Sequence, residues 1–290
     1  NQLEPGRIMW EPNSDLNKYG TPMVLMTIPM FTNHESVEGL YFDSSITTPF
    51  HFVTVSGVAE SPSNPVGGLS YINGDFDRGV RYMKELGVDY FISYTDSITD
   101  KAIMSDELEN LFQSSPFTVF KIYSDKVQVV DAEVVNFNQP ELVERISNSI
   151  FKQEITDSFF NLAMKEFKLD NKKRIIEGID AEESQIQNRL SNKKSEINNV
   201  RISNNKITFE TEHPNELHIV KVSYFPNWKI ENGSGPYRLS PSFMGVIPYS
   251  NEVSITFENT SLEKSLNIIS LIIFLLTAYL LVFRIKKYAE

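Results

Sequence analysis

The chain of 290 residues contains no cysteine, only four histidines and only two tryptophans. The absence of cysteine excludes disulfides, thiolate zinc sites, iron–sulfur clusters and a cysteine nucleophile. Positive charge is also scarce, since 27 Lys and Arg stand against 38 Asp and Glu. The net charge of −11 argues against a general nucleic-acid-binding protein, which neutralises phosphates with cationic side chains. We therefore expect no nucleic-acid partner.

Histidine spacing does not predict a metal site. Zinc-binding pairs are usually four residues apart on a helix or alternate along a strand. His213 and His218 are too far apart for either pattern, with Pro214 between them. His34 and His51 lie far away in the sequence. We expect surface or core roles for these side chains and no bound metal.

Motifs for phosphate binding and nucleophilic catalysis are missing as well. The glycines at 67–68 and 233–235 are not followed by the lysine and helix start of a phosphate-binding loop. We therefore expect no cofactor. Glu35 and Glu38 are a possible acid–base pair, but spacing alone cannot place two carboxylates in a cleft. A pocket that brings them together with His51 would favour an enzyme.

Long apolar runs are absent except at the C-terminal end. Residues 266–283 read LNIISLIIFLLTAYLLVF and carry no charge. At about 1.5 Å per residue, a helix of this length reaches roughly 27 Å, close to the thickness of the hydrocarbon core. The run predicts a transmembrane helix, and the alternative is a buried helix of a soluble protein.

The flanking charges predict the orientation of this helix. Arg284, Lys286 and Lys287 follow it, whereas Glu263 and Lys264 cancel before it. The positive-inside rule places residues 263–290 as a transmembrane helix with a basic cytoplasmic tail, in the cell membrane, and the body outside. An exported body needs a signal, and none is visible after Asn1. We therefore expect the chain to be part of a longer protein with earlier membrane segments.

Residues 1–135 are expected to form an extracytoplasmic α+β domain. Residues 1–75 are rich in Pro, Gly, Ser and Thr, which favours loops and short strands, including the apolar run Pro49–Val55, over helix. A helix is predicted between Asp77, which suits an N-cap, and Gly87, which suits a C-terminal stop. The other expected elements are a strand over 88–94, a helix from Ser105, and a hairpin of strands over 117–123 and 127–132.

The rest of the body changes from helical to strand periodicity. Residues 136–200 are expected to be a helical and linker region, with one helix after Pro140 and another that carries Phe159 and Phe167. Over residues 201–262 apolar side chains alternate, as in Val253, Ile255 and Phe257, which predicts a small antiparallel β-sandwich. The expected fold class is α+β: a mixed α/β layer followed by that sandwich and one C-terminal transmembrane helix.

Aromatic residues cluster around two turns of the expected sandwich. The segments are SYFPNW at 223–228 and GPYRLSP at 235–241. Flat apolar rings with polar rims suit a sugar or a protein ligand. The candidate ligand-binding residues are Tyr224, Trp228, Tyr237 and Arg238. The alternative is a structural role in which Tyr224 and Trp228 fill the end of the sandwich.

The same segments carry a family resemblance. Further motifs are EPNSDLNKYGTP at 11–22, EGLYFDSSITTPFHF at 38–52, SPSNP at 61–65 and GVRYMKELGVDYF at 79–91. With these motifs the chain resembles the C-terminal part of large multi-pass actinobacterial membrane proteins labelled as having a 6-pyruvoyl-tetrahydropterin synthase-related membrane domain. More distantly it resembles YfhO-like proteins of the GT-C glycosyltransferase type. The resemblance covers most of 7–135 and 200–283.

The resemblance implies a role in cell-envelope glycan or glycolipid assembly. It implies that many transmembrane helices precede Asn1 and that the catalytic acidic residue lies on an early outer loop, outside this chain. The implied partners are membrane lipid, a lipid-linked sugar or envelope glycan, and the upstream transmembrane region of the same protein. The pterin synthase chemistry is not implied, because its three-histidine zinc site needs a closely spaced pair. The alternative function is a non-catalytic envelope scaffold or protein-interaction module.

Overall fold

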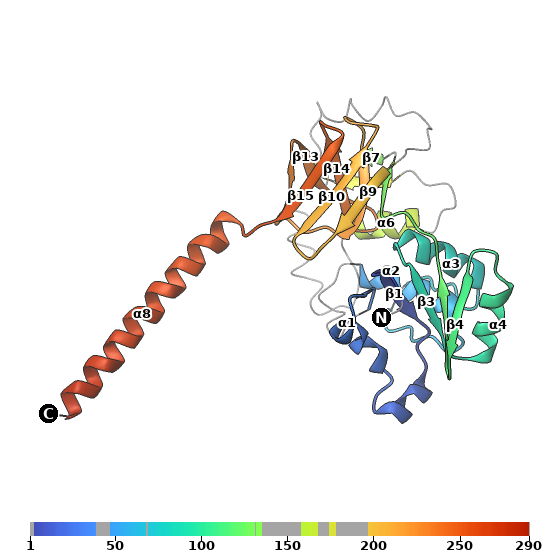
Figure 1. Cartoon of the computed structure of the whole chain (residues 1–290), viewed down its shortest axis with the longest axis horizontal. Helices are drawn as coiled ribbons and strands as arrows, with labels where there is room; N and C mark the ends of the chain where they lie inside the picture. The colour runs from blue at the N-terminus through green and yellow to red at the C-terminus, as the bar shows by residue number, and fades with distance from the viewer. Residues whose placement is uncertain are drawn as a thin grey trace.

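A computed structural model describes residues 3–38, 47–67, 69–130, 132–134, 158–167, 174–177 and 197–289. Figure 1 shows two packed units and a separate long helix. The first is the α/β unit (residues 3–122), a mixed sheet with helices. The second is the sandwich, formed by two sheets from residues 127–134, 174–177 and 197–257. This arrangement confirms the predicted α+β class, the β-sandwich and the long C-terminal helix.

The α/β unit is built on a five-stranded sheet in the order β2-β1-β3-β5-β4. Strands β1, β2 and β3 run parallel, and β5 and β4 are antiparallel to their neighbours. The strands are β1 (Arg7–Trp10), β2 (Glu35–Ser36), β3 (Tyr90–Ser93), β4 (Glu109–Ser114) and β5 (Phe117–Lys121). The helices are α1 (Ile28–Phe31), α2 (Thr48–Val58), α3 (Phe76–Glu85) and α4 (Asp96–Met104), with 3-10 turns η1 (Ser14–Tyr19) and η2 (Val24–Thr27).

Helix α3 confirms the helix that was predicted between residues 77 and 87. The Asp75 side chain caps its start by accepting a hydrogen bond from the backbone N–H of Arg78 at 3.2 Å. Gly87 follows its end with φ of 68°, a conformation that glycine adopts without steric cost. Strand β3 then follows, within the predicted strand over 88–94.

Helix α2 corrects the expectation of loops and short strands in residues 1–75. Its bounds include the run Pro49–Val55, which is therefore helical and not a strand. Nearly every side chain of α2 is buried, so the helix has no polar face and no helical periodicity in its sequence. The hydroxyls of Thr54 and Ser56 donate to backbone carbonyls of the same helix, which makes their burial tolerable.

Two further expectations for this unit are wrong. The helix expected from Ser105 is replaced by strand β4, and the helix lies one element earlier as α4, capped by Thr95. The expected hairpin of 117–123 with 127–132 does not form either. Strand β5 joins the sheet of the α/β unit, whereas β6 (Val127–Val129) pairs with β11 (His218–Ser223) in the sandwich. Residues 122–126 therefore connect the two units.

The sandwich consists of a six-stranded and a four-stranded sheet. Their orders are β6-β11-β14-β13-β8-β7 and β12-β15-β10-β9. The strands not yet given are β7 (Ala132–Val134), β8 (Arg174–Glu177), β9 (Ile197–Ile202), β10 (Lys206–Thr211), β12 (Trp228–Glu231), β13 (Gly233–Leu239), β14 (Phe243–Pro248) and β15 (Glu252–Phe257). The predicted alternation of Val253, Ile255 and Phe257 is confirmed as strand β15, in which Val253 and Ile255 belong to the sandwich core.

The six-stranded sheet has a core on each of its faces. Along β14, Met244 and Val246 belong to the sandwich core, whereas Phe243 and Ile247 belong to the core of the α/β unit. This alternation follows from the two-residue period of a strand. The core of the α/β unit thus includes side chains of the sandwich, so the two units pack against each other through this shared core.

Helix α6 (Ser158–Phe167) contributes to this shared core and confirms the helix predicted to carry Phe159 and Phe167. The Phe167 ring lies 5.2 Å from that of Phe50 on α2 and 4.5 Å from that of Tyr82 on α3. The helix expected after Pro140, and most of the expected linker over 165–201, lie outside the described residues.

Helix α8 (Ser261–Ala289) contains the predicted span 266–283. Its segment Ser261–Leu281 is long and apolar enough to cross a membrane, and none of it is buried against the body. Figure 1 shows α8 extending away from both units. An apolar helix without a protein partner is unfavourable in water, so α8 supports association with a membrane.

Candidate functional site

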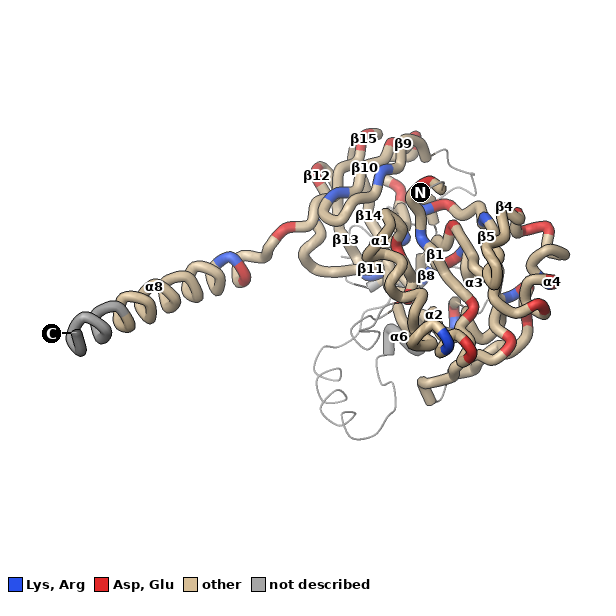
Figure 2. The backbone as a smooth tube through the Cα atoms, turned by 60° about the horizontal axis from the view of Figure 1, so that its bottom comes forward, with Lys and Arg blue, Asp and Glu red and all other residues tan. Residues whose placement is uncertain are grey.

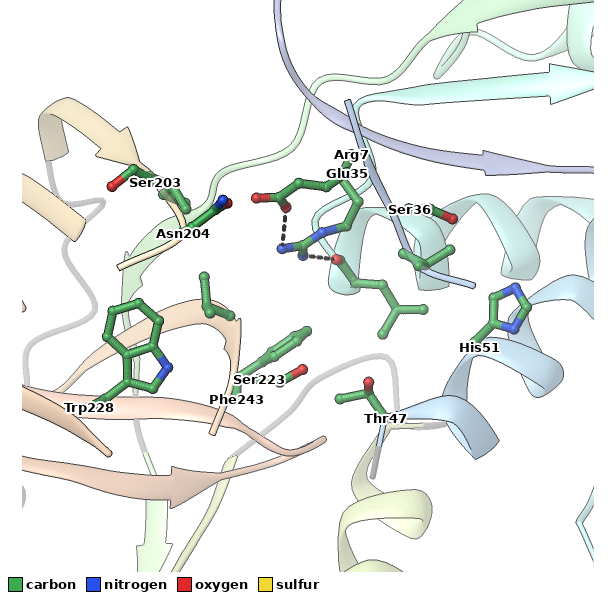
Figure 3. A pocket seen from close by; sticks show the side chains of 14 residues that line it. Arg7, Glu35, Ser36, Thr47, His51, Ser203, Asn204, Ser223, Trp228 and Phe243 are labelled. Carbon is green, nitrogen blue, oxygen red and sulfur yellow. Dashed lines mark hydrogen bonds and ion pairs between the residues drawn. The ribbon is translucent and has the colours of Figure 1, made fainter. Parts of the chain in front are cut away.

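A cleft of about 380 Å³ lies where the α/β unit meets the sandwich. We call it the inter-unit cleft. Figure 3 shows that Ser203, Asn204 and Trp228 line one side and Ser36, Thr47 and His51 the other. The complete lining is Arg7, Glu35, Ser36, Val37, Thr47, His51, Leu86, Ile202, Ser203, Asn204, Val222, Ser223, Trp228 and Phe243.

Arg7 and Glu35 bring opposite charges to the cleft from the neighbouring parallel strands β1 and β2. Their side chains form an ion pair at 3.1 Å (Figure 3). The second Arg7 nitrogen, Nη1, donates to the backbone carbonyls of Leu86 at 2.7 Å and Lys221 at 2.8 Å. Three acceptors therefore hold this guanidinium in one orientation, so it offers a fixed donor group at the cleft.

Two lysines bond the end of α3, next to the cleft residue Leu86. Lys221 Nζ donates to the Lys84 carbonyl at 2.8 Å, and Lys126 Nζ bonds the Gly87 carbonyl and Asp89 Oδ2. These carbonyls lie at the C-terminal end of α3, where the helix dipole favours cations. Burial lowers the pKa of each lysine to about 8, because the charged form loses its water.

The sandwich wall combines polar side chains with one indole. Ser203 and Asn204 lie on the turn between β9 and β10, and Ser223 ends β11. Trp228 starts β12 and packs edge-on against Phe257 at 5.2 Å. Hydroxyl, amide and guanidinium groups around an aromatic ring can bind a polyhydroxylated ligand through hydrogen bonds and ring stacking.

His51 and Glu38 form a buried pair beside the cleft. His51 Nε2 lies 3.7 Å from Glu38 Oε2. Burial lowers the pKa of His51 to about 3 and raises the pKa of Glu38 to about 7. His51 is therefore neutral near pH 7, whereas Glu38 is partly protonated at that pH. His51 Nδ1 is buried and has no hydrogen-bond partner among the described residues.

A second pocket of about 350 Å³, the proline pocket, lies on the Glu38 side of this pair. Trp10, Met26 and Phe52 give it apolar walls, and Glu38 is the one carboxyl group among its described lining residues. The other lining residues are Pro12, Asn13, Ser14, Pro22, Met23, Ser61, Pro62, Ser63 and Pro65. Apart from Trp10, Met23 and Met26, the lining residues of this pocket come from the segments 11–22, 38–52 and 61–65.

Glu35, Glu38 and His51 are brought close but are divided between two pockets. Glu35 and His51 line the inter-unit cleft, whereas Glu38 lines the proline pocket and reaches the cleft residue His51 with its carboxylate. Glu38 has a pKa suited to general acid–base work near neutral pH. A shared cleft for both carboxylates, which the enzyme hypothesis requires, is not formed by the described residues.

No family model, curated protein or solved structure matches the chain. Function is therefore inferred from the site itself. Within the described parts of the chain, no group of three or more His, Asp or Glu side chains is arranged to hold a metal ion.

The four predicted ligand-binding residues do not converge. Trp228 lines the inter-unit cleft, and Tyr224 packs beside it against the sandwich core. Tyr237 lies on the opposite face of the six-stranded sheet, against the core of the α/β unit. Arg238 is half-buried, and its Nε donates to Ser242 Oγ at 3.4 Å. Of the four, Trp228 alone reaches a described pocket.

Sequence reasoning did not find Arg7, Ser203 or Asn204. Arg7 and Asn204 are almost 200 residues apart, and neither lies in a recognisable motif. Only the packing of the two units brings them to one cleft. A weak signal existed for Arg7, because it begins a short apolar strand and its charge needs a partner when that strand is buried.

Proposed function

We propose that this chain is the extracytoplasmic C-terminal region of a multi-pass membrane protein similar to GT-C glycosyltransferases. In this proposal the body binds a sugar of an envelope glycan or glycolipid in the inter-unit cleft. The catalytic residues lie elsewhere in the protein. The resemblance of the motifs motivates the role, and the membrane-compatible helix α8 agrees with it.

The composition of the inter-unit cleft carries the proposal. Sugars are recognised by fixed hydrogen-bond donors and acceptors together with an aromatic face. The cleft offers the guanidinium of Arg7, the amide of Asn204 and the indole of Trp228. Arg7 is held by its bonds to Glu35 and to two carbonyls, so little conformational entropy is lost when a ligand binds.

The proposed orientation rests on charge. Arg284, Lys286 and Lys287 follow the apolar segment of α8, and such clusters stay in the cytoplasm. This chain has no cysteine, so a cysteine introduced into it reports the sidedness of the body in the full-length protein once any upstream cysteines are replaced with serine. In intact cells, a membrane-impermeant maleimide should label Asn198→Cys, on exposed strand β9, without permeabilisation. Labelling only after permeabilisation would place the body in the cytoplasm and contradict this orientation.

Saturation-transfer NMR on the purified full chain in detergent tests the cleft. The probes are methyl glycosides of glucose, galactose, mannose, arabinose and N-acetylglucosamine. We expect at least one to receive saturation transfer from the protein. Asn204→Trp should abolish the transfer by filling the cleft, whereas Asn198→Trp, on the neighbouring strand but outside the cleft, should preserve it.

The alternative, a non-catalytic scaffold, predicts a different result. A scaffold binds a protein partner and no sugar, so none of the glycosides would receive saturation. Transfer that survives Asn204→Trp would place sugar binding outside the cleft. Either result, obtained with folded variants, would contradict the proposal.

A further inference from the structure

The α/β unit carries a surface segment that is apolar, uncharged and only partly packed. Residues 19–33 contain no Asp, Glu, Lys or Arg, although charged residues make up 22% of the chain. Within this segment Met30 is 75% exposed, Phe31 79% and Met23 43%. Large apolar side chains grouped on a surface usually mark a contact with a partner or a membrane.

The segment is anchored from below, so its exposed side chains are held in place. Leu25, Met26 and Ile28 pack against the apolar cluster of Ile8, Trp10 and Tyr90 on the face of the five-stranded sheet. The Thr27 hydroxyl donates to the Val24 carbonyl at 2.6 Å, and the Thr32 hydroxyl donates to the Ile28 carbonyl at 2.9 Å. The inner side chains thus pack against the sheet, while Met30 and Phe31 of α1 are exposed.

The position of this surface relates it to α8. In Figure 1, α8 runs to the lower left, and α1 and the preceding short helices form the lower left part of the α/β unit. In Figure 2, α1 again lies on the side of the α/β unit that faces α8, and α4 lies on the far side. A helix that crosses a bilayer brings the membrane surface close to the elements on its own side of the body.

We propose that Met23, Met30 and Phe31 form a second membrane contact, which rests on the bilayer surface when α8 spans it. We call these three residues the α1 patch. Interfacial segments insert apolar side chains about 5–10 Å into the boundary between headgroups and acyl chains. Because residues 19–33 are uncharged, no ionic group of the segment loses its water on insertion. This contact does not depend on sugar binding in the cleft.

Two consequences follow for the body. A second contact limits the rotation of the body about the connection at residues 258–260, where Asn227 also donates a hydrogen bond to Glu263 of α8 at 2.7 Å. It also brings the proline pocket close to the lipid surface, because Met23 belongs both to the patch and to the wall of that pocket.

Depth-dependent fluorescence quenching tests the proposal on the full chain in phosphatidylcholine vesicles. Phe31→Cys is labelled with an environment-sensitive fluorophore, and the bilayer contains phosphatidylcholine spin-labelled near the headgroup. The matched control is Met104→Cys, because Met104 is an apolar side chain that is 83% exposed on α4, away from α8. Leu275→Cys, within the apolar part of α8, reports a fully inserted position.

We expect spin-labelled lipid to quench the label at residue 31 roughly threefold more than the label at 104, with aqueous iodide showing the reverse order. Equal quenching at residues 31 and 104, with normal quenching at 275, would overturn the proposal. Both sites are exposed, so labelling should not disturb folding, and circular dichroism checks this.

A second copy of the chain is the other possible occupant of the patch. Reconstitution at less than one chain per vesicle separates the two cases. Lipid quenching at residue 31 that persists at this dilution supports the membrane contact. Protection from iodide that appears only at high density would assign the patch to contact between copies and overturn the proposal.

Discussion

Lys221 on strand β11 donates a hydrogen bond from Nζ to the backbone carbonyl of Lys84 in the last turn of α3, at 2.8 Å and across 137 residues. Arg7 and Lys126 donate to two carbonyls shortly after it, those of Leu86 and Gly87. Three cations from distant parts of the chain thus neutralise one helix end. Lys221 in this cluster joins the sandwich to the α/β unit, and Arg7 and Leu86 in the same cluster line the inter-unit cleft.

Lys221→Met should weaken this connection. The substitution keeps an apolar stem but leaves the Lys84 carbonyl without its charged donor, which costs about 2 kcal/mol of unfolding free energy. Urea unfolding followed by near-ultraviolet circular dichroism measures the change. Lys229→Met is the control, because this lysine is exposed and forms an exposed ion pair with Glu258; the substitution should change stability by no more than about 0.5 kcal/mol. Equal effects of the two substitutions would contradict the assigned role.

Gly87→Ala should be destabilising at the same place. Gly87 has φ of +68°, and an added Cβ would lie 3.1 Å from Arg7 Nη1 and 3.4 Å from the Lys221 side chain. The left-handed backbone alone costs an alanine about 1–2 kcal/mol. Thermal or urea unfolding measures this loss of stability by comparison with Gly67→Ala, because at Gly67 φ is ordinary and an added Cβ meets nothing within 4 Å. A Gly87→Ala chain as stable as Gly67→Ala would show that the turn relaxes without cost.

Local signals in the sequence predicted those elements that form their own pattern. Helix α3 has a cap, a stop and a periodic apolar face, and strand β15 alternates with period two, so both were predictable. Helix α2 was not, because it is buried on all sides and its apolar run has no helical period. Strand β4 was also missed, since its exposed residues form a strand only through pairing with β5.

The candidate site was less predictable than the fold. Trp228 was found because an aromatic residue in a turn stands out, whereas Arg7 and Asn204 depend on how the two units pack. The aromatic cluster also divided in a way that spacing does not reveal. Tyr224 and Tyr237 lie on opposite sides of the six-stranded sheet. The reason is that the pairing of β13 with β14 shifts in register between Ser234 and Tyr237, which turns Tyr237 to the other face. Strand periodicity cannot anticipate such a shift.

Trp228→Ala and Trp228→Phe separate the structural role of this residue from a binding role. Trp228 is 7% exposed and packs on Phe257, so the alanine variant should lose about 3–5 kcal/mol of unfolding free energy. The phenylalanine variant retains most of the packing and should lose less than about 1.5 kcal/mol. We expect Trp228→Phe to fold but to give weaker saturation transfer from the glycosides. Unchanged transfer in that variant would restrict Trp228 to the core role.

Glu38 should make stability depend on pH in a direction opposite to that of an ordinary carboxylate. Its pKa rises from 4.5 to about 7 on folding because burial disfavours the charged form, so between these values the folded chain binds more protons than the unfolded chain. Its contribution to the free energy of unfolding is therefore complete below pH 4.5 and is lost as the pH rises through 7, a loss on the order of 3 kcal/mol.

Glu38→Gln cannot ionise, so its stability relative to the unaltered chain should grow between pH 4.5 and 8 in urea unfolding. His51, whose pKa falls to about 3, contributes stability above pH 6.5 that is lost towards acid, but it is present in both chains and cancels to first order in the comparison. Glu212→Gln, at an exposed position on the sandwich, is the matched control and should run parallel to the unaltered chain. A constant difference between Glu38→Gln and the unaltered chain across this range would show that Glu38 is solvated in the folded protein.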